Sequence, residues 1–277
     1  MNLKGKLKKL TLGIADKKST YENRTICGVS LRVMPNTTRN KEDQDDCWWF
    51  YLTKNHKVIY DIGCNAGYSA IIALIQDPLK KIILVDPNPS ALKKAAQNLI
   101  ENGLSNNAQY VSAFVGKELD SKVKFYTVGA GAAGSMHASH AKTAAAVNSF
   151  MEVSTITLDH MLSFYKVIPD LVKIDVEGAE TLVMQSAKKL ANQSKCTFFI
   201  EMHNVEDFGM EAAAESMLKW CEEMDYKAWY PTTGKALMNA KEIKDRGKCH
   251  LLLLPKNQEY PDYLKGIPVY APLPKSI

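Results

Sequence analysis

The sequence lacks any long apolar segment. No stretch within its 277 residues approaches the roughly 20 consecutive apolar residues that a membrane-spanning helix needs. The first residues, Met1 to Lys9, alternate leucine with lysine and lack the apolar core and small-residue cleavage site of a signal peptide. We therefore expect neither a secretion signal nor a transmembrane segment.

Paired cysteines are also absent. The six cysteines lie far apart, and none forms a C-x-x-C pair. In a chain of this length, that spacing argues against a zinc ribbon and favours reduced thiols in a cytosol-like compartment. The balance of 46% hydrophobic and 23% charged residues is typical of a globular protein and excludes a disordered one. We therefore expect a cytoplasmic protein of one or two domains.

Basic residues are concentrated at the start of the chain. Residues 1–60 hold 12 lysines and arginines against 6 acidic residues, whereas the remaining residues hold 23 against 24. The net charge of +5 therefore comes from the N-terminal region, and we expect a basic arm over residues 1–45. Such an arm either attracts phosphates, anionic glycans or a membrane surface, or is simply a solvated segment.

From residue 57 onward, short apolar runs alternate with helical stretches. The runs do not alternate strictly between apolar and polar residues, which is typical of strands buried on both faces of a parallel sheet. The expected strands are Val58–Tyr60, Ile82–Val85, Tyr110–Val115, Leu171–Ile174, Cys196–Met202, Tyr226–Tyr230 and His250–Leu254, and the expected helices are Ser90–Asn102, Ala179–Asn192 and Met210–Met224. This pattern predicts an α/β fold with an open, doubly wound sheet.

Two further segments have distinct compositions. The aromatic segment Cys47–Leu52 is expected to form a helix that closes one edge of the sheet. Residues 129–148 are rich in glycine, alanine, serine and histidine, and they show no strand or helix pattern. We interpret this irregular segment as a substrate loop, with a disordered surface loop as the alternative.

The first expected strand leads into a loop that contains two glycines. In open α/β sheets, ligands bind beyond the carboxyl ends of the strands. Gly63 and Gly67 lack a Cβ, so the backbone can turn tightly and approach a ligand closely. Asp61 leads the loop, and the middle glycine of the dinucleotide-binding G-x-G-x-x-G pattern is absent. A carboxylate here suits the ammonium of a methionine-derived ligand better than it suits a pyrophosphate.

The second expected strand ends in another acid. Asp86 lies about 20 residues beyond the glycine loop, where a carboxylate can accept hydrogen bonds from both hydroxyls of a ribose. Asn88 follows as the cap of the next helix. The alternative role of Asp86 is that of a plain helix-capping acid.

Acids and a histidine follow two later strands. Asp175 and Glu177 follow the fourth expected strand, and Glu201 and His203 end the fifth. Because strand alternation places each pair on one face, we expect the four side chains to surround one crevice. Carboxylates this close raise one another's pKa values, which suits proton transfer or the binding of a divalent ion.

Together these motifs resemble the FkbM family of S-adenosylmethionine-dependent methyltransferases. The resemblance runs from about residue 45 to about residue 205 and is most specific in PDLVKIDVEGAE at residues 169–180, followed by Glu201-Met202-His203. It implies a Rossmann-like class I methyltransferase domain over residues 46–256, with a mostly parallel seven-stranded sheet and an antiparallel last strand. A C-terminal tail follows over residues 257–277. The chain departs from the family pattern at Asp86, where many members have glutamate, and at Cys64, where alanine is usual.

The resemblance also implies the residues of the site. The residues expected to contact S-adenosylmethionine are Asp61, Gly63, Asn65, Gly67, Tyr68, Asp86, Pro87, Asn88, Ala113 and Asp175. Members of the family are mostly O-methyltransferases that act on hydroxyls of sugars and natural products. We therefore expect an O-methyltransferase whose acceptor is a hydroxyl of a sugar, a glycan or a related small molecule.

The chemistry of methyl transfer suggests catalytic roles. The methyl group leaves a sulfonium by in-line displacement, and a sugar hydroxyl is helped by a general base with a near-neutral pKa. His203 is the candidate base, because the unperturbed pKa of histidine suits the task, and Asp175 is the alternative base or an orienting residue. Asp175, Glu177 and Glu201 could instead hold Mg²⁺, which would acidify a bound hydroxyl. We favour the metal-free route, because transfer from a sulfonium does not require a Lewis acid.

Three other functions stay open at this point. A ribose 2′-O methyltransferase would bind nucleic-acid phosphates with the basic arm, but it needs a catalytic lysine. Lys173 shares its strand parity with Asp175, yet no ordered Lys–Asp–Lys–Glu set is evident. A nicotinamide-dependent dehydrogenase is disfavoured by the missing glycine. A non-catalytic module could retain the same fold and bind a partner.

Overall fold

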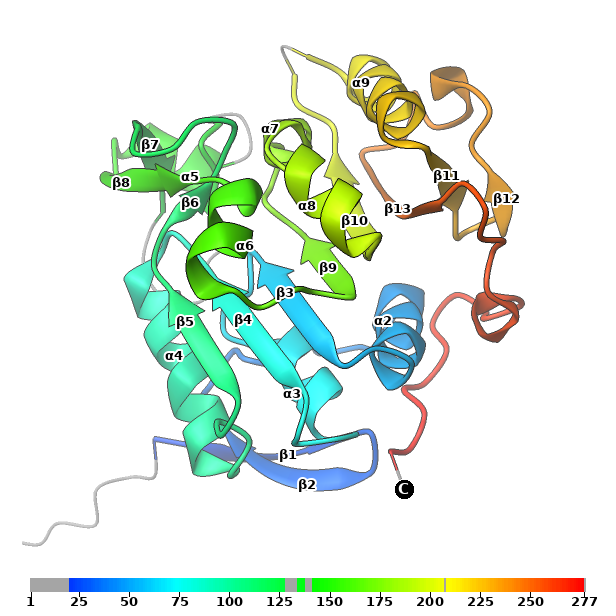
Figure 1. The fold of residues 1–277 in the computed structure, drawn as a ribbon. Helices are drawn as coiled ribbons and strands as arrows, with labels where there is room; N and C mark the ends of the chain where they lie inside the picture. Colours follow the sequence, from blue (N-terminus) through cyan, green and yellow to red (C-terminus); the bar gives the residue numbers. More distant parts are fainter. Residues whose placement is uncertain (1–19, 128–133, 138–140, 207, 277) are drawn as a thin grey trace, which may run out of the picture.

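The computed structural model describes residues 20–127, 134–137, 141–206 and 208–276 (Figure 1). An eight-stranded sheet runs through the molecule. In spatial order, its strands are β12 (Lys235–Ala236), β11 (Tyr226–Tyr230), β13 (Lys248–Pro255), β10 (Thr197–His203), β9 (Leu171–Ile174), β3 (Val58–Ile62), β4 (Lys81–Val85) and β5 (Ala108–Val111). The pairs from β10 to β5 are parallel, and β13 runs antiparallel to both β10 and β11.

This topology confirms the predicted Rossmann-like class I architecture. The chain runs outward from β3 to β4 and β5 on one side and then returns to β9 on the other, so the strand order reverses at β3. The antiparallel last strand is β13, which lies between β10 and β11. The short strand β12 was not predicted and adds an eighth strand at the edge.

Helices cover both faces of the sheet and bury both sides of its strands. One layer holds α2 (Gln44–Lys54), α3 (Tyr68–Leu74) and α4 (Pro89–Glu101), and the other holds α6 (Leu158–Tyr165), α7 (Glu180–Gln185), α8 (Lys188–Ser194) and α9 (Met210–Met224). Consecutive residues of β4 divide between the two cores: Ile82 and Leu84 face the first layer, and Ile83 and Val85 the second. This burial on both faces explains why the strands show no strict alternation of polarity.

Two predicted elements are each split in the structure. The strand predicted at Tyr110–Val115 ends its pairing with β4 at Val111, and Phe114–Val115 forms β6 in a separate sheet with β8 (Phe150–Ile156) and β7 (Lys122–Tyr126). The helix predicted at Ala179–Asn192 is divided into α7 and α8. The second helix begins where the carboxylate of Asp159, on α6, accepts hydrogen bonds from the backbone of Lys189 and Leu190 at 3.1 and 2.8 Å. Both splits depend on contacts that are remote in sequence.

Helix α2 lies on a face of the sheet, so the prediction that it closes an edge was wrong. Asp43 caps its first turn, with Asp46 completing a capping box. The indole of Trp49 stacks on the ring of Phe199 in β10, with centroids 6.2 Å apart. Because β10 is an interior strand, this contact holds α2 over the middle of the sheet and brings its acidic first turn close to the strand ends.

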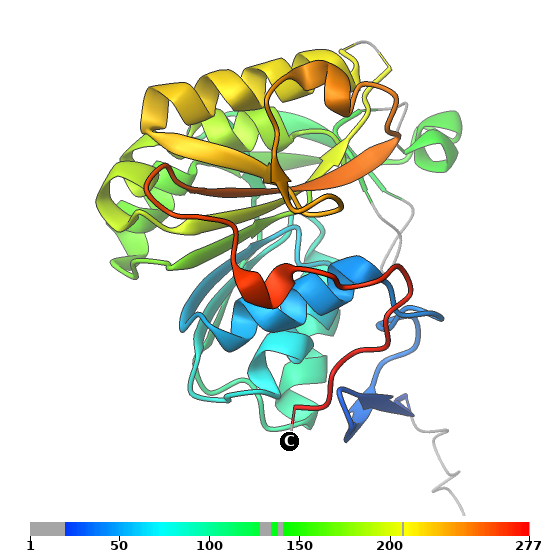
Figure 2. The same cartoon turned by 90° about the vertical axis from the view of Figure 1, so that its right-hand side faces the viewer.

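The described residues beyond the predicted methyltransferase domain pack against it. β1 (Glu22–Ile26) and β2 (Val29–Val33) form a hairpin, after which the backbone N–H of Met34 donates to Asn98 of α4 at 2.7 Å. The C-terminal segment runs past α2 toward this hairpin (Figure 2), where the backbone N–H of Ser276 donates to the carbonyl of Cys27 at 2.9 Å. Residues 1–19 of the predicted basic arm lie outside the described residues.

Part of the predicted substrate loop is described. Ser135 forms a bridge with Tyr126 at the end of β7, and α5 (Lys142–Ala146) follows. Residues 129–133 and 138–140 of the loop lie outside the described residues. Short 3₁₀ helices occur at Ala240–Glu242 and Asp262–Leu264.

Two further observations concern membrane-spanning helices and cysteines. Within the described ranges, no helix combines the length and the apolar character that crossing a bilayer would require. All six cysteines are buried and carry free thiols.

We predict that Asp159→Ala lowers the free energy of unfolding by about 0.5–2 kcal/mol, because α8 loses the side chain that caps its first N–H groups. Urea denaturation measures the change. Asp159→Asn keeps an acceptor oxygen and should lose less than Asp159→Ala. Wild-type stability in the alanine variant would contradict the capping role.

Candidate active site

The glycine loop after β3 is held against the loop after β9. Gly63 has a φ of +83°, and a Cβ at this position would lie 1.8 Å from the carbonyl oxygen of Asp175. Gly67 has a φ of +81°, and its Cβ would lie 2.9 Å from the Cβ of Ala95 on α4. Gly63 is therefore required for the carboxyl ends of β3 and β9 to meet, and Gly67 for the loop to pack closely against α4.

Asp86 anchors the same loop from the end of β4. One carboxylate oxygen accepts from the backbone N–H of Asn65 at 2.9 Å, and the other from that of Asn88 at 2.8 Å. Burial raises the pKa of Asp86 to about 6, although these two hydrogen bonds oppose the shift. Each oxygen retains a lone pair, so the carboxylate can still accept a ligand hydroxyl. Asn88 caps α4 by accepting from Ser90 at 3.0 Å, as predicted.

A cavity of about 610 Å³ opens beyond the ends of β3, β4 and β9. Seven of the predicted cofactor-binding residues line it: Gly63, Asn65, Asp86, Pro87, Asn88, Ala113 and Asp175. The side-chain oxygen of Asn65 is buried there without a hydrogen-bond partner among the described residues, as expected of a group that awaits a ligand donor. The geometry of the cavity therefore fits a nucleoside with ribose hydroxyls near Asp86.

A second cavity of about 870 Å³ adjoins the first, and the two share Gly63, Asn65 and Asp175. Tyr68, another predicted cofactor residue, lines this second cavity. Gly67 and Asp61 line neither cavity. Asp61 is fully buried under the loop, where it accepts from the hydroxyl of Ser69 at 2.6 Å. Its other oxygen, Oδ1, is buried without a hydrogen-bond partner among the described residues. The position of Asp61 suits a support for the loop, and its direct contact with the cofactor stays a prediction.

The four predicted catalytic residues lie near one another, but His203 has an unexpected environment. Its Nδ1 lies 2.9 Å from Glu180, and its Nε2 lies 3.6 Å from Glu177. Burial alone would lower the pKa of His203, but the hydrogen bond and charge of Glu180, with two further carboxylates, raise it to about 9. His203 is therefore an imidazolium at neutral pH, which argues against its expected role as the base.

Lysines form ion pairs with two of the four acids that line the second cavity. Lys173 lies 3.0 Å from Asp175, and Lys248 lies 2.5 Å from Glu201. Burial opposes the ionisation of Asp175, but the charges of Lys173 and His203 hold the pKa of this carboxyl well below its usual range. Asp175 is therefore a stable carboxylate and a weak base.

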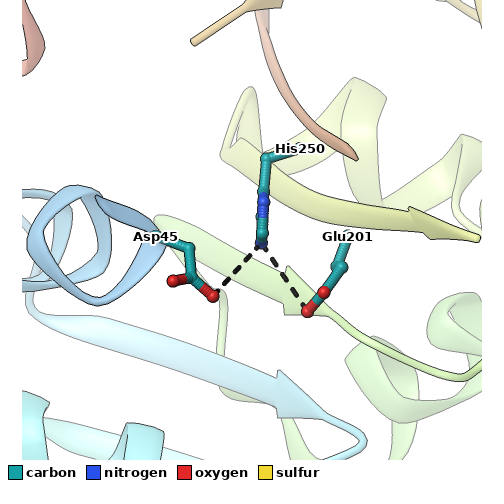
Figure 3. Close-up of side chains that lie close together, drawn as sticks. All are labelled: Asp45, Glu201 and His250. Carbon is teal, nitrogen blue, oxygen red and sulfur yellow. Dashed lines mark ion pairs between the residues drawn. The ribbon is translucent and has the colours of Figure 1, made fainter. Parts of the chain in front are cut away.

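The sequence missed two members of the cluster, Asp45 and His250 (Figure 3). Nε2 of His250 lies 3.7 Å from Glu201 and 3.9 Å from Asp45. His250 comes from β13, directly opposite Glu201 in the antiparallel register, and Asp45 comes from the first turn of α2. Lys248 and His250 are two residues apart in β13, so their side chains lie on the same face of the sheet. Predicting their contact with Glu201 from the sequence would have required knowledge of how β13 pairs with β10.

Two groups of three side chains have the composition of a metal site, with potential ligand atoms within 4.8 Å of one another. One group is Asp45, Glu201 and His250, and the other is Asp175, Glu177 and His203. In the first group, Arg39 already binds Asp45 at 2.8 Å and Lys248 binds Glu201. In the second group, Lys173 binds Asp175, and a protonated imidazole has no lone pair to offer a metal. These donor sets are already balanced by protein cations, so we assign no metal to either.

The sheet order, the glycine loop and the acid after β4 together define a class I methyltransferase. Residues 61–228 match the model of the Methyltransferase FkbM domain. The chain belongs to the FkbM methyltransferase family, as its motifs predicted, and S-adenosylmethionine is the cofactor of this family.

Solved structures with related folds share little sequence with this chain, and no curated protein sequence matches it. The methyltransferase FkbM from Methylobacillus flagellatus KT is 12% identical, with a TM-score of 0.45. The match covers 72% of this chain and 43% of the length of that protein. M. jannaschii TYW2, solved with AdoMet, is 12% identical, with a TM-score of 0.46 over 85% of each chain. A putative rRNA-methylase from Clostridium thermocellum is 8% identical, with a TM-score of 0.46 over 74% of this chain and 92% of its own.

Asp86→Ala is expected to weaken the binding of S-adenosylhomocysteine by about 1–3 kcal/mol, because hydrogen bonds to a charged acceptor are lost. Isothermal titration calorimetry measures the affinity, and Asp120→Asn, a change on a distant surface turn, serves as the control. Unchanged affinity of Asp86→Ala would leave this residue as an anchor of the loop only.

The raised pKa of His203 predicts a pH-dependent stability. The unfolded imidazole titrates near 6.5, so its stabilising effect is complete below that pH and is lost as the pH rises to about 9. We expect the free energy of unfolding to fall by about 3 kcal/mol more in the wild type than in His203→Gln across this window. Chemical denaturation at a series of pH values tests this. Parallel pH curves for the two proteins would refute the assigned ionisation.

Proposed function

We propose that this chain is an O-methyltransferase that methylates a hydroxyl of a sugar, a glycan or a related small molecule. The observation that supports this most is the second cavity, which adjoins the cofactor cavity and is lined by carboxylates, an imidazole and aromatic rings. Carboxylates accept hydrogen bonds from hydroxyls, and aromatic faces pack against the C–H faces of sugar rings. Trp49 and Tyr68 supply such rings, and Glu201 and Asp45 supply the acceptors.

The cofactor would be held in the first cavity. Asp86 would accept from its ribose hydroxyls, and Gly63 and Asn65 would lie where the two cavities join. S-adenosylmethionine supplies an activated methyl group on a sulfonium, so the protein mainly needs to align the acceptor and help remove its proton. Asp175 lines both cavities as a stable carboxylate, which suits it to orient the acceptor and to attract positive charge.

One observation favours the alternative of a ribose 2′-O methyltransferase. The structure brings Lys173 and Lys248 onto Asp175 and Glu201, a spatial set of two lysines and two acids that the sequence order did not reveal. However, Asp175 and its neighbouring acids hold the pKa of Lys173 above its usual range against the effect of burial, so this ammonium is no base. The basic residues 1–19, which this alternative would use, lie outside the described residues.

The test is methyl transfer from S-adenosylmethionine labelled in its methyl group. The purified protein is incubated separately with neutral oligosaccharides, with small polyhydroxylated metabolites and with transfer RNA. We expect label in a methyl ether of a sugar or small molecule, identified by mass spectrometry, and none when Asp86→Ala replaces the wild type. Label in 2′-O-methyl nucleosides would replace this proposal with the alternative. Absence of S-adenosylhomocysteine binding would overturn both.

A further inference from the structure

His250 has a ring nitrogen that faces the second cavity without a close partner. The distances of 3.7 Å to Glu201 and 3.9 Å to Asp45 are too long for hydrogen bonds, and the described residues offer this imidazole no nearer acceptor or donor (Figure 3). The residue is nevertheless largely buried, with 8% of its surface exposed. A polar nitrogen on a cavity wall that no protein group satisfies is available to a ligand.

The orientation of this imidazole is fixed by aromatic packing. Its ring stacks on Phe199 with centroids 4.9 Å apart and planes 17° apart, and the edge of Trp48 approaches it at 5.9 Å. The backbone of His250 pairs with Glu201 across the strands. These contacts direct Nε2 toward the space between two carboxylates, close to the residues that the two cavities share.

Its charge state is opposite to that of His203. Burial lowers the pKa of His250 below its usual value, although the carboxylates of Glu201, Asp45 and Asp175 oppose the shift. The charge of Lys173 acts in the same direction as burial. At neutral pH, His250 is therefore a neutral imidazole that can accept a proton.

We propose that His250 is the general base for methyl transfer and that Asp45 and Glu201 stabilise the imidazolium that forms. This inference rests on the proposed O-methyltransferase function and assigns the base within it. The proton of the acceptor hydroxyl moves to Nε2 of His250, while the acceptor oxygen bonds to the methyl carbon. The C–S bond breaks, and sulfur keeps its electron pair as a neutral thioether. One positive charge thus leaves the sulfur and one appears on His250, beside two carboxylates.

The same arrangement restricts the acceptor. A hydroxyl next to Nε2 lies between the carboxylates of Asp45 and Glu201, which can accept hydrogen bonds from neighbouring hydroxyls. The structure therefore favours an acceptor with several hydroxyl groups at this position.

The first test measures the ionisation of the two histidines directly. Protein labelled with ¹⁵N-histidine and saturated with S-adenosylhomocysteine is titrated by NMR over roughly pH 5 to 10, the range in which histidines titrate. Resonances are assigned with His250→Gln, His203→Gln and His160→Gln. We expect the pKa of His250 to lie below the ordinary histidine value of about 6.5 and that of His203 to lie well above it. A pKa of His250 at or above the ordinary value would overturn the proposal, whether or not the acceptor is known.

The second test uses the acceptor identified by methyl transfer. His250→Gln should reduce kcat by roughly 10²–10⁴-fold and leave the affinity for S-adenosylhomocysteine within about twofold of the wild type. The wild-type kcat should rise through one ionisation below pH 7, and this step should be absent in the variant. His160→Gln, on the exterior helix α6, should behave as the wild type.

The outcomes separate the two proposals. Wild-type turnover in His250→Gln would overturn the role of His250 while leaving O-methyl transfer intact. Loss of activity in chelator, restored by Mg²⁺, would replace the base with a metal-assisted route. Failure to bind S-adenosylhomocysteine would overturn the proposed function itself.

Discussion

The approach of Gly63 to the carbonyl of Asp175 is the constraint on which the rest of the site depends. With no Cβ at Gly63, the loops after β3 and β9 meet where the strand order reverses, and a side chain there would separate them. Both cavities are built around this junction and share its residues. The anchoring of the glycine loop by Asp86 and its packing on α4 therefore serve one purpose, which is to bring a cofactor cavity and an acceptor cavity to a common boundary.

Three acids around that boundary each form an ion pair with a basic side chain. Lys173 is paired with Asp175, Lys248 with Glu201, and Arg39 with Asp45, so each of these three carboxylates lies beside a cation. Without these cations, buried carboxylates would raise one another's pKa values and compete for protons. The pairing leaves the site rich in hydrogen-bond acceptors. The proposed proton acceptor is then the imidazole of His250, which carries no charge before the reaction.

Much of the architecture could be predicted from sequence, because the strands and the motifs at their ends are local signals. The apolar runs indicated buried parallel strands, and the acids after them marked the site. The split of the helix at Ala179–Asn192 could not be predicted, because it depends on the carboxylate of Asp159 on another helix. Asp45 and His250 were missed for the same reason: both meet Glu201 only through tertiary contacts, Asp45 through the packing of α2 and His250 through the pairing of β13 with β10.

The contrast between the two histidines shows why residue type alone does not assign a base. Both rings are nine-tenths buried and both lie within 4 Å of Glu201. His203 hydrogen-bonds Glu180 at 2.9 Å, and this bond together with the charges of Glu180, Asp175 and Glu177 outweighs the effect of burial. His250 has no such bond and is packed between aromatic rings, so burial prevails. The carboxylates around each ring, with Glu180 bonded directly to His203, thus decide which imidazole is charged at rest. The uncharged ring is the one whose protonation can replace the positive charge that methyl transfer removes from sulfur.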